Sequence, residues 1–252
     1  MNKNRLLLIS IFTLSLTLRL ILCLINDQAN DNHYEVIEWT IKNHALPQDE
    51  ICSECFQPKL YYIINLAIIS VLKLSLRSEI ITCMQMVNFI LSFFILLYLW
   101  KFIQRQNVSE KIKLAAFALI AFNPCLLGIN VQATNDTLEI LFGILTIYYA
   151  DVFFSKNKFI YIGILCAVLI GASIAKATGV ILFIALLIIF IVKLFVGALS
   201  EKKIMFKSFV VLLFNYFLIV PYFGGYYQNY LKYNEPFHLI LKKAPPDRKS
   251  VV

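Results

Sequence analysis

The chain has 252 residues, of which 60% are hydrophobic and 15% are charged. A soluble domain averages about 45–50% apolar and about 25% charged residues, so a single water-soluble core does not account for this composition. The net charge of +8 would suggest nucleic acid in a soluble protein. Here the basic residues form short clusters between apolar runs, which is typical of membrane proteins. We therefore expect an all-α, polytopic membrane protein with no nucleic-acid partner.

Eight apolar segments follow one another along the chain. They cover residues 6–25, 60–72, 80–100, 112–131, 137–154, 159–175, 178–199 and 206–223. A hydrocarbon core about 30 Å thick needs about 20 helical residues, and runs of about 10–14 are more often interfacial or re-entrant. The first segment has a basic start and no small-residue cleavage site, so we interpret it as a retained span. The segment 60–72 is too short to span.

The basic clusters decide the topology. With 60–72 at the surface and the N-terminus in the cytoplasm, the clusters at 101–113, 156–158 and 202–207 all become cytoplasmic, as the positive-inside tendency requires. A spanning 60–72 would place the first two clusters outside. The sequence therefore predicts seven spans and one re-entrant or surface helix.

Under this topology, four polar features share the non-cytoplasmic face. They are the loop 26–59, the turn 132–136, the turn at Lys176 and the aromatic stretch from Tyr222. We interpret residues 1–246 as one membrane domain in which 26–79 is an external loop with surface helices.

The last six residues have a separate interpretation. Residues 247–252 are what GAT CGG AAG AGC GTC GTG encodes, a string that resembles a sequencing-library adapter. We expect them to be an artefact that follows the N-terminal part of a longer protein.

The first loop offers several candidate acids. Residues 33–44 have the pattern of an amphipathic helix on a membrane surface. Asp31 precedes it and suits a helix cap. It equally suits a general base, because partial desolvation at the membrane boundary raises the pKa of a carboxylate. Asp27 and Glu35 are rival candidates for that base.

Two further charged residues lie at turns between apolar segments. Asp136 precedes an apolar helix, where the helix dipole favours a carboxylate, but polar residues between two spans also mark functional sites. Lys176 is a candidate phosphate partner, with snorkelling as the alternative. For Arg19, near the outer end of the first span, snorkelling is the favoured interpretation.

Cys52 and Cys55 are the only cysteine pair in a polar loop. Their spacing occurs in zinc sites, but no second pair accompanies them, so we predict no metal site. On a non-cytoplasmic face a disulfide is permitted.

Several stretches together resemble the GT-C glycosyltransferases, above all protein O-mannosyltransferases and aminoarabinose transferases. The matches are Asp31-Asn32-His33-Tyr34-Glu35, Leu46-Pro47, Gln57-Pro58-Lys59-Leu60-Tyr61-Tyr62, Asn123-Pro124 before the turn 132–136, Lys176-Ala177-Thr178-Gly179, and Asn229-Tyr230 to Asn234-Glu235-Pro236-Phe237. The resemblance covers about residues 5–240. The paired acidic motif usual in the family's first loop is not intact here.

The resemblance implies a hexosyltransferase that uses a dolichyl- or undecaprenyl-phosphate sugar within a lipid membrane. The membrane is the endoplasmic reticulum in a eukaryote or the plasma membrane in a bacterium. Asp31 and Asp136 match the family's acids, whereas Lys59, Lys176, His33 and Tyr61 match substrate-binding positions. The need for a divalent metal, the sugar and the acceptor stay open.

Two alternatives belong to other functional classes. A transporter or flippase would use Asp136 and Lys176 as an ion or substrate site, and transporters usually contain internal repeats and helices broken at the midplane. We find no repeat, and the polar residues lie at one face. A non-catalytic membrane subunit with the same fold is the third possibility, because the acidic pair is broken.

Overall fold

Ten helices make up the regular structure of the part of the chain that is described. The computed structural model describes residues 3–27, 30–47, 51–196 and 199–223, together with 227, 230 and 231. The predicted artefact at 247–252 and the motif at 234–237 lie outside these residues. The helices are α1 (Lys3–Ile25), α2 (His33–Asn43), α3 (Leu60–Leu72), α4 (Arg77–Gln104), α5 (Glu110–Ala121), α6 (Pro124–Asn130), α7 (Asp136–Lys156), α8 (Ile160–Ala175), α9 (Gly179–Val196) and α10 (Leu199–Phe223).

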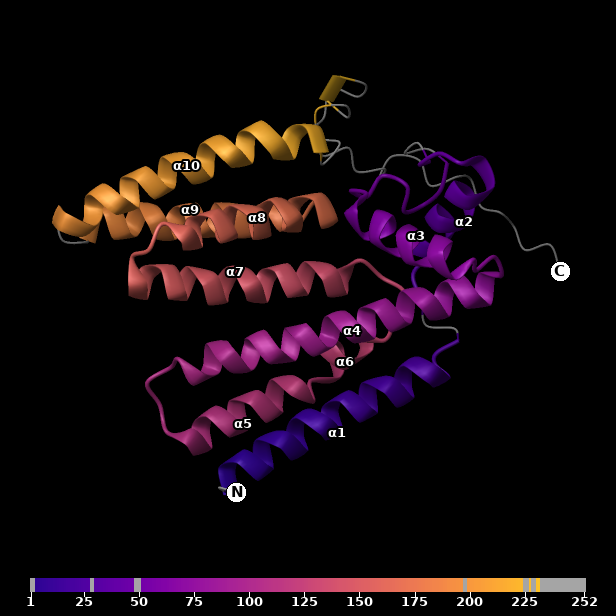
Figure 1. Cartoon of the computed structure of the whole chain (residues 1–252), viewed down its shortest axis with the longest axis horizontal. Coiled ribbons are helices and arrows are strands. Elements are labelled where there is room, and N and C mark those ends of the chain that lie inside the picture. Colours follow the sequence, from indigo (N-terminus) through magenta and orange to yellow (C-terminus); the bar gives the residue numbers. More distant parts are fainter. Residues whose placement is uncertain are drawn as a thin grey trace.

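The long helices lie side by side in a bundle in which neighbours along the chain run in opposite directions (Figure 1). Helix α7 packs against α4 and α8, α8 packs against α9 and α10, and α1 packs against α4 and α5. The short helices α2 and α3 gather at one end, beyond the ends of α7 and α8 (Figure 1). We call this the loop end, and we call the opposite end, where α4 and α7 finish, the basic end.

Within the described residues, five helices are long and apolar enough to cross a membrane: α1, α4, α7, α9 and residues 204–221 of α10. The bent pair α5–α6 makes a sixth if it counts as one span. Helix α8 is apolar but has only 16 residues, about 24 Å of helix. The structure thus confirms an all-helical fold with several candidate spans, whereas the count of seven stays a prediction.

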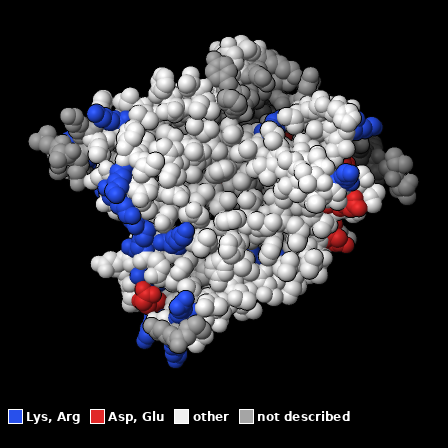
Figure 2. Space-filling view, viewed as in Figure 1, with Lys and Arg blue, Asp and Glu red and all other residues white. Residues whose placement is uncertain are grey.

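Large apolar side chains cover the outside of the bundle. On α9, for example, Ile181 is 63% exposed, Ile188 56% and Phe195 80%. A soluble monomer rarely exposes so continuous an apolar surface, which hydrocarbon would cover in a bilayer. Figure 2 shows Lys and Arg gathered at the left end of this view, where α4 and α7 each carry a lysine in the last turn. Acidic side chains are visible mainly at the other end.

The predicted span 112–131 is broken in the structure. It breaks at Phe122 and Asn123, and the two halves, α5 and α6, meet at 53°. Pro124 explains the break, because proline donates no backbone hydrogen bond and disfavours helical geometry in the residue before it. Asn123 caps the new helix, since its side chain accepts a hydrogen bond from Leu126 N at 3.1 Å.

Arg19 does not snorkel, so the favoured interpretation of this residue was wrong. Its side chain is fully buried and donates to the Ala121 carbonyl at 2.9 Å and the Ser15 carbonyl at 3.2 Å. Ala121 is the last residue of α5. The guanidinium therefore satisfies a carbonyl that the break leaves without its helical partner.

Candidate functional site

Helix α2 positions the first candidate residues. Val36 and Ile37 are fully buried and pack in one apolar cluster with Tyr61 and Tyr62 of α3. The structure thus confirms the helix and its apolar stripe, which faces α3 and α4, whereas its location on a membrane surface stays a prediction.

Asp31 is not the cap of α2, so the interpretation of this residue as a helix cap was wrong. Asn32 occupies the cap position, and no side chain makes a capping hydrogen bond there. The Asp31 carboxylate is 53% exposed, and its Oδ2 lies 4.0 Å from His33 Nε2. Asp31 is therefore available for a role other than capping.

The junction of α7 and α8 supplies the second group of charges. The N-terminus of α7 and the C-terminus of α8 lie at the loop end because the two helices are antiparallel neighbours. Lys176, the residue after α8, forms an ion pair with Asp136 and lies 3.8 Å from Glu139. Both carboxylates are in the first turn of α7, where the helix dipole favours negative charge.

Side-chain amides of α4 and of the first loop hold the turn before Asp136. Asn88 of α4 donates to the carbonyls of Gln132 at 2.6 Å and Thr134 at 2.7 Å. Asn30 accepts from the backbone N–H of Ala133 at 2.8 Å. Because buried amides without such partners would be costly, this network fixes the two segments against each other. It explains how residues about 100 positions apart reach one site.

His33 lies where the two groups of charges meet. Its side chain is 4% exposed, and its Nδ1 lies 2.7 Å from the Tyr62 hydroxyl. Burial lowers the pKa of His33 to about 4; Asp31 and Asp136 act in the opposite direction, and Lys176 adds to the lowering. The imidazole is therefore neutral near pH 7. Of the candidates predicted from the sequence, the structure brings Asp31, His33, Asp136 and Lys176 together.

Glu54 is a member of this cluster that the sequence interpretation missed. Its Oε2 lies 3.9 Å from His33 Nε2, and the carboxylate is 24% exposed. Burial raises the pKa of Glu54, and Asp31, which carries a like charge, raises it further. The available signal was its place between Cys52 and Cys55.

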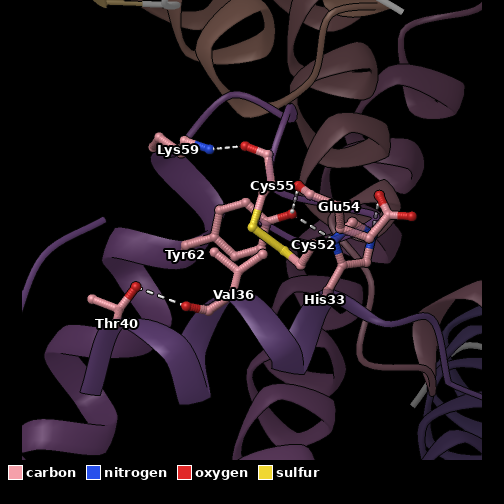
Figure 3. Close-up of a disulfide and its surroundings, with 8 residues drawn as sticks. All are labelled: His33, Val36, Thr40, Cys52, Glu54, Cys55, Lys59 and Tyr62. Carbon is pink, nitrogen blue, oxygen red and sulfur yellow. Dashed lines mark hydrogen bonds and ion pairs between the residues drawn. A yellow bond between two sulfur atoms is a disulfide. The ribbon is translucent and has the colours of Figure 1, made fainter. Parts of the chain in front are cut away.

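Cys52 and Cys55 form a disulfide. Figure 3 shows that this disulfide closes the turn that holds Glu54 beside His33 and Tyr62. Sulfurs joined in this way are not thiolate ligands, and no group of three potential metal ligands occurs among the described residues.

Tyr61 and Lys59 are the other two predicted substrate-binding residues. Tyr61 is fully buried, its ring centroid lies 6.2 Å from that of His33, and burial raises the pKa of its phenol. The Lys59 amine donates to the Cys55 carbonyl in its own loop (Figure 3). Of the two rival acids, Asp27 is exposed and Glu35 is half-buried in the first turn of α2.

The cluster combines a half-exposed carboxylate, a neutral buried imidazole and an ammonium ion held by two carboxylates. Such a set can accept a proton at Asp31 and stabilise negative charge at Lys176, whose ammonium has three N–H donors. Comparison of the chain with protein-family models, with curated proteins and with solved structures finds no match.

Proposed function

We propose that this protein is an integral, multi-pass membrane glycosyltransferase that moves a sugar from a polyprenyl phosphate to an acceptor hydroxyl. The observation that carries the proposal is the convergence of Asp31, His33, Asp136 and Lys176, from three segments, at one end of an apolar bundle. The sequence resemblance to GT-C enzymes supports it independently of this geometry. The gathering of lysines at the basic end supports a non-cytoplasmic location for the site.

The proposed reaction begins with the acceptor hydroxyl beside Asp31. Asp31 removes the hydroxyl proton as the oxygen attacks the anomeric carbon of the donor sugar. The bond from that carbon to the phosphate oxygen breaks, and the polyprenyl phosphate leaves with the electron pair. One N–H of Lys176 stabilises the negative charge that develops on the phosphate, while Asp136 and Glu139 hold the ammonium in place.

The location of the site suits a donor with a long apolar tail. The charged residues lie at the ends of helices whose outer surfaces are apolar, so a lipid-linked phosphate can reach them while its chain stays in hydrocarbon. A water-soluble donor would have no need of this position.

The test is sugar transfer from a labelled polyprenyl-phosphate donor in membranes that contain the full chain. Asp31→Asn should lower kcat about 10²- to 10⁴-fold, because general-base assistance typically contributes that much. Asp27→Asn is the matched control, since Asp27 is an exposed acid of the same loop. Undiminished transfer by Asp31→Asn would contradict the assignment of the base.

A second candidate function is solute transport, and the break between α5 and α6 favours it. Transporters commonly place broken helices at their binding sites. Here the buried Arg19 occupies the break and binds the Ala121 carbonyl, as a bound cation would. Counterflow of a labelled solute in vesicles, without sugar transfer, would support this second function over the first.

A further inference from the structure

Glu54 faces His33 from a turn that a disulfide closes. We propose that Glu54 is a positioning residue that orients His33 from a turn held by the Cys52–Cys55 disulfide, so that reduction of the disulfide releases His33. The effect on catalysis rests on the proposed glycosyl transfer, whereas the effect on His33 does not.

The turn around the disulfide leaves Glu54 little freedom. Only two residues, Ser53 and Glu54, separate the bonded cysteines. Two backbone hydrogen bonds reinforce the turn, from Cys55 N to the Cys52 carbonyl at 3.2 Å and from Gln57 N to the Glu54 carbonyl at 3.2 Å. The Glu54 carbonyl and carboxyl groups therefore have defined positions relative to α2 and α3 (Figure 3).

The hydrogen bonds around His33 assign its proton. Tyr62 has one hydroxyl hydrogen, which it donates to the Glu54 carbonyl at 3.2 Å. The Tyr62 oxygen then accepts from His33 Nδ1–H at 2.7 Å, which leaves Nε2 of the neutral ring as an acceptor.

The lone pair of Nε2 faces two carboxyl groups, Glu54 at 3.9 Å and Asp31 at 4.0 Å. Glu54 is the more buried of the two, at 24% exposed against 53% for Asp31. The Glu54 residue therefore lies against both sides of the ring: its carboxyl group faces Nε2, and its carbonyl holds Nδ1 through the Tyr62 hydroxyl.

The other charged groups that act on His33 do not change this assignment. Asp136 and Lys176 act on it with opposite signs, and they are already paired with each other. Tyr62 faces Nδ1 instead, and burial raises the pKa of its phenol, so that it stays protonated. Glu54 and Asp31 are therefore the charged groups that face Nε2.

Reduction of the disulfide opens the turn. A dithiol such as dithiothreitol supplies two electrons and two protons, so that Cys52 and Cys55 become thiols while the dithiol becomes a cyclic disulfide. Glu54 then loses its fixed position, and with it the Tyr62 hydroxyl loses its carbonyl partner. We expect at least as large a change at His33 as from Glu54→Ala, which removes the carboxyl group but keeps the carbonyl that accepts from Tyr62.

The experiment reads His33 directly, by ¹⁵N NMR of the full-length protein in detergent with labelled histidines. The chain has three histidines, so His44→Gln and His238→Gln variants assign the signals. The oxidised wild type should show a neutral His33 with the proton on Nδ1. Glu54→Gln should keep that state, because its amide fills the place of the carboxyl group beside Nε2, whereas Glu54→Ala and dithiothreitol should produce a mixture of tautomers.

Two controls separate a specific effect from unfolding. The Cys52→Ser/Cys55→Ser variant should resemble the reduced wild type and should not respond to dithiothreitol. Glu38→Ala removes a different acid of the same loop and should leave His33 unchanged. A His33 signal that is the same in wild type, Glu54→Ala and reduced protein would overturn the proposal, and so would loss of the state in Glu54→Gln.

Transfer assays then test the catalytic consequence. Glu54→Ala and reduction should lower kcat about 10- to 100-fold with little change in KM, because a misplaced catalytic constellation acts on the chemical step. Glu54→Gln should restore most of the rate. If the NMR result is as expected but the wild type transfers no sugar, the proposed function is refuted and the role of Glu54 in orienting His33 remains. Full activity in Glu54→Ala would instead overturn its part in catalysis.

Discussion

The two ends of α7 each carry a carboxylate that pairs with a basic residue from a neighbouring element. At the loop end Asp136 pairs with Lys176, and at the basic end Asp151 pairs with Arg105. The exposed fractions are similar, 32% and 24% for the first pair against 34% and 27% for the second. Exposure therefore does not distinguish them.

Their surroundings do distinguish them. Asp136 and Lys176 both act on the buried His33, together with Asp31, and Glu54 lies 3.9 Å from the same ring. Arg105 meets only Asp151 and the Ser155 hydroxyl among the hydrogen bonds of its side chain in the described residues. An ion pair indicates a site only where buried titratable groups converge on it.

The largest expected effect comes from Gly179, three residues after Lys176. A Cβ on Gly179 would lie 2.3 Å from the Ala172 carbonyl oxygen, a backbone atom that cannot rotate away. Gly179→Ala should therefore open the turn that holds Lys176 and lower the Tm in detergent by roughly 5 °C or more. Thermal unfolding followed by circular dichroism measures this shift.

Gly163, toward the basic end of α8, is the matched control. A Cβ there meets nothing within 4 Å. Gly163→Ala should stabilise the helix by about 0.5–1 kcal/mol, because alanine loses less backbone entropy than glycine. Equal destabilisation by both substitutions would show that the loop end is no more tightly constrained than the rest of α8.

The next effect concerns Lys176 and Arg105, the basic residues of the two ion pairs. Lys176→Met should lower sugar transfer by about 100-fold or more, because it removes the charge that stabilises the leaving phosphate. Arg105→Met should change transfer less than about twofold and stability by about 1 kcal/mol or less, as is usual for exposed pairs. Initial rates in membranes, normalised to protein level, provide the comparison. Similar losses from both substitutions would remove the distinction between the two ends.

A third prediction concerns how the free energy of unfolding depends on pH, which we attribute to His33 at the loop end. The pKa of His33 is about 4 in the folded protein and about 6.5 in the unfolded chain. Between these values the unfolded state binds more protons, so the free energy of unfolding should fall as the pH is lowered from about 6.5 toward 4. Each unit of pKa difference corresponds to about 1.4 kcal/mol.

Denaturant unfolding at pH 7, 6 and 5 measures this slope. Glu54 partly opposes this slope. Its pKa is raised in the folded protein, so at a pH above the usual pKa of a glutamate the folded state binds more protons at Glu54 than the unfolded state does. His33→Gln should therefore remove the loss of stability on acidification. An unchanged slope in His33→Gln would mean that another group is responsible.

The smallest effect should come from Lys59. Its amine binds the Cys55 carbonyl within its own loop. Lys59→Ala should lower transfer less than about fivefold, since a contact at the edge of the site contributes about 1 kcal/mol or less. A loss as large as that of Lys176→Met would restore Lys59 as a phosphate-binding residue and extend the site toward α3.

The sequence predicted several local features of the fold because they depend on neighbouring residues. The surface helix from His33 followed from its apolar stripe, the helix at 60–72 from its apolar run, and the start of α7 from Asp136. The break at Pro124 was equally local and was overlooked, although proline and the preceding asparagine signalled it.

The sequence by itself determined the apolar helices, the ends that carry basic residues, and four members of the candidate site. Only the tertiary structure decided that Glu54 faces His33 and that Arg19 is buried at the helix break. The physical reason is that both contacts join segments far apart in the chain, through side chains whose neighbours are set by packing. Periodicity records which face of a helix is apolar, but it does not record which distant polar group that face will meet.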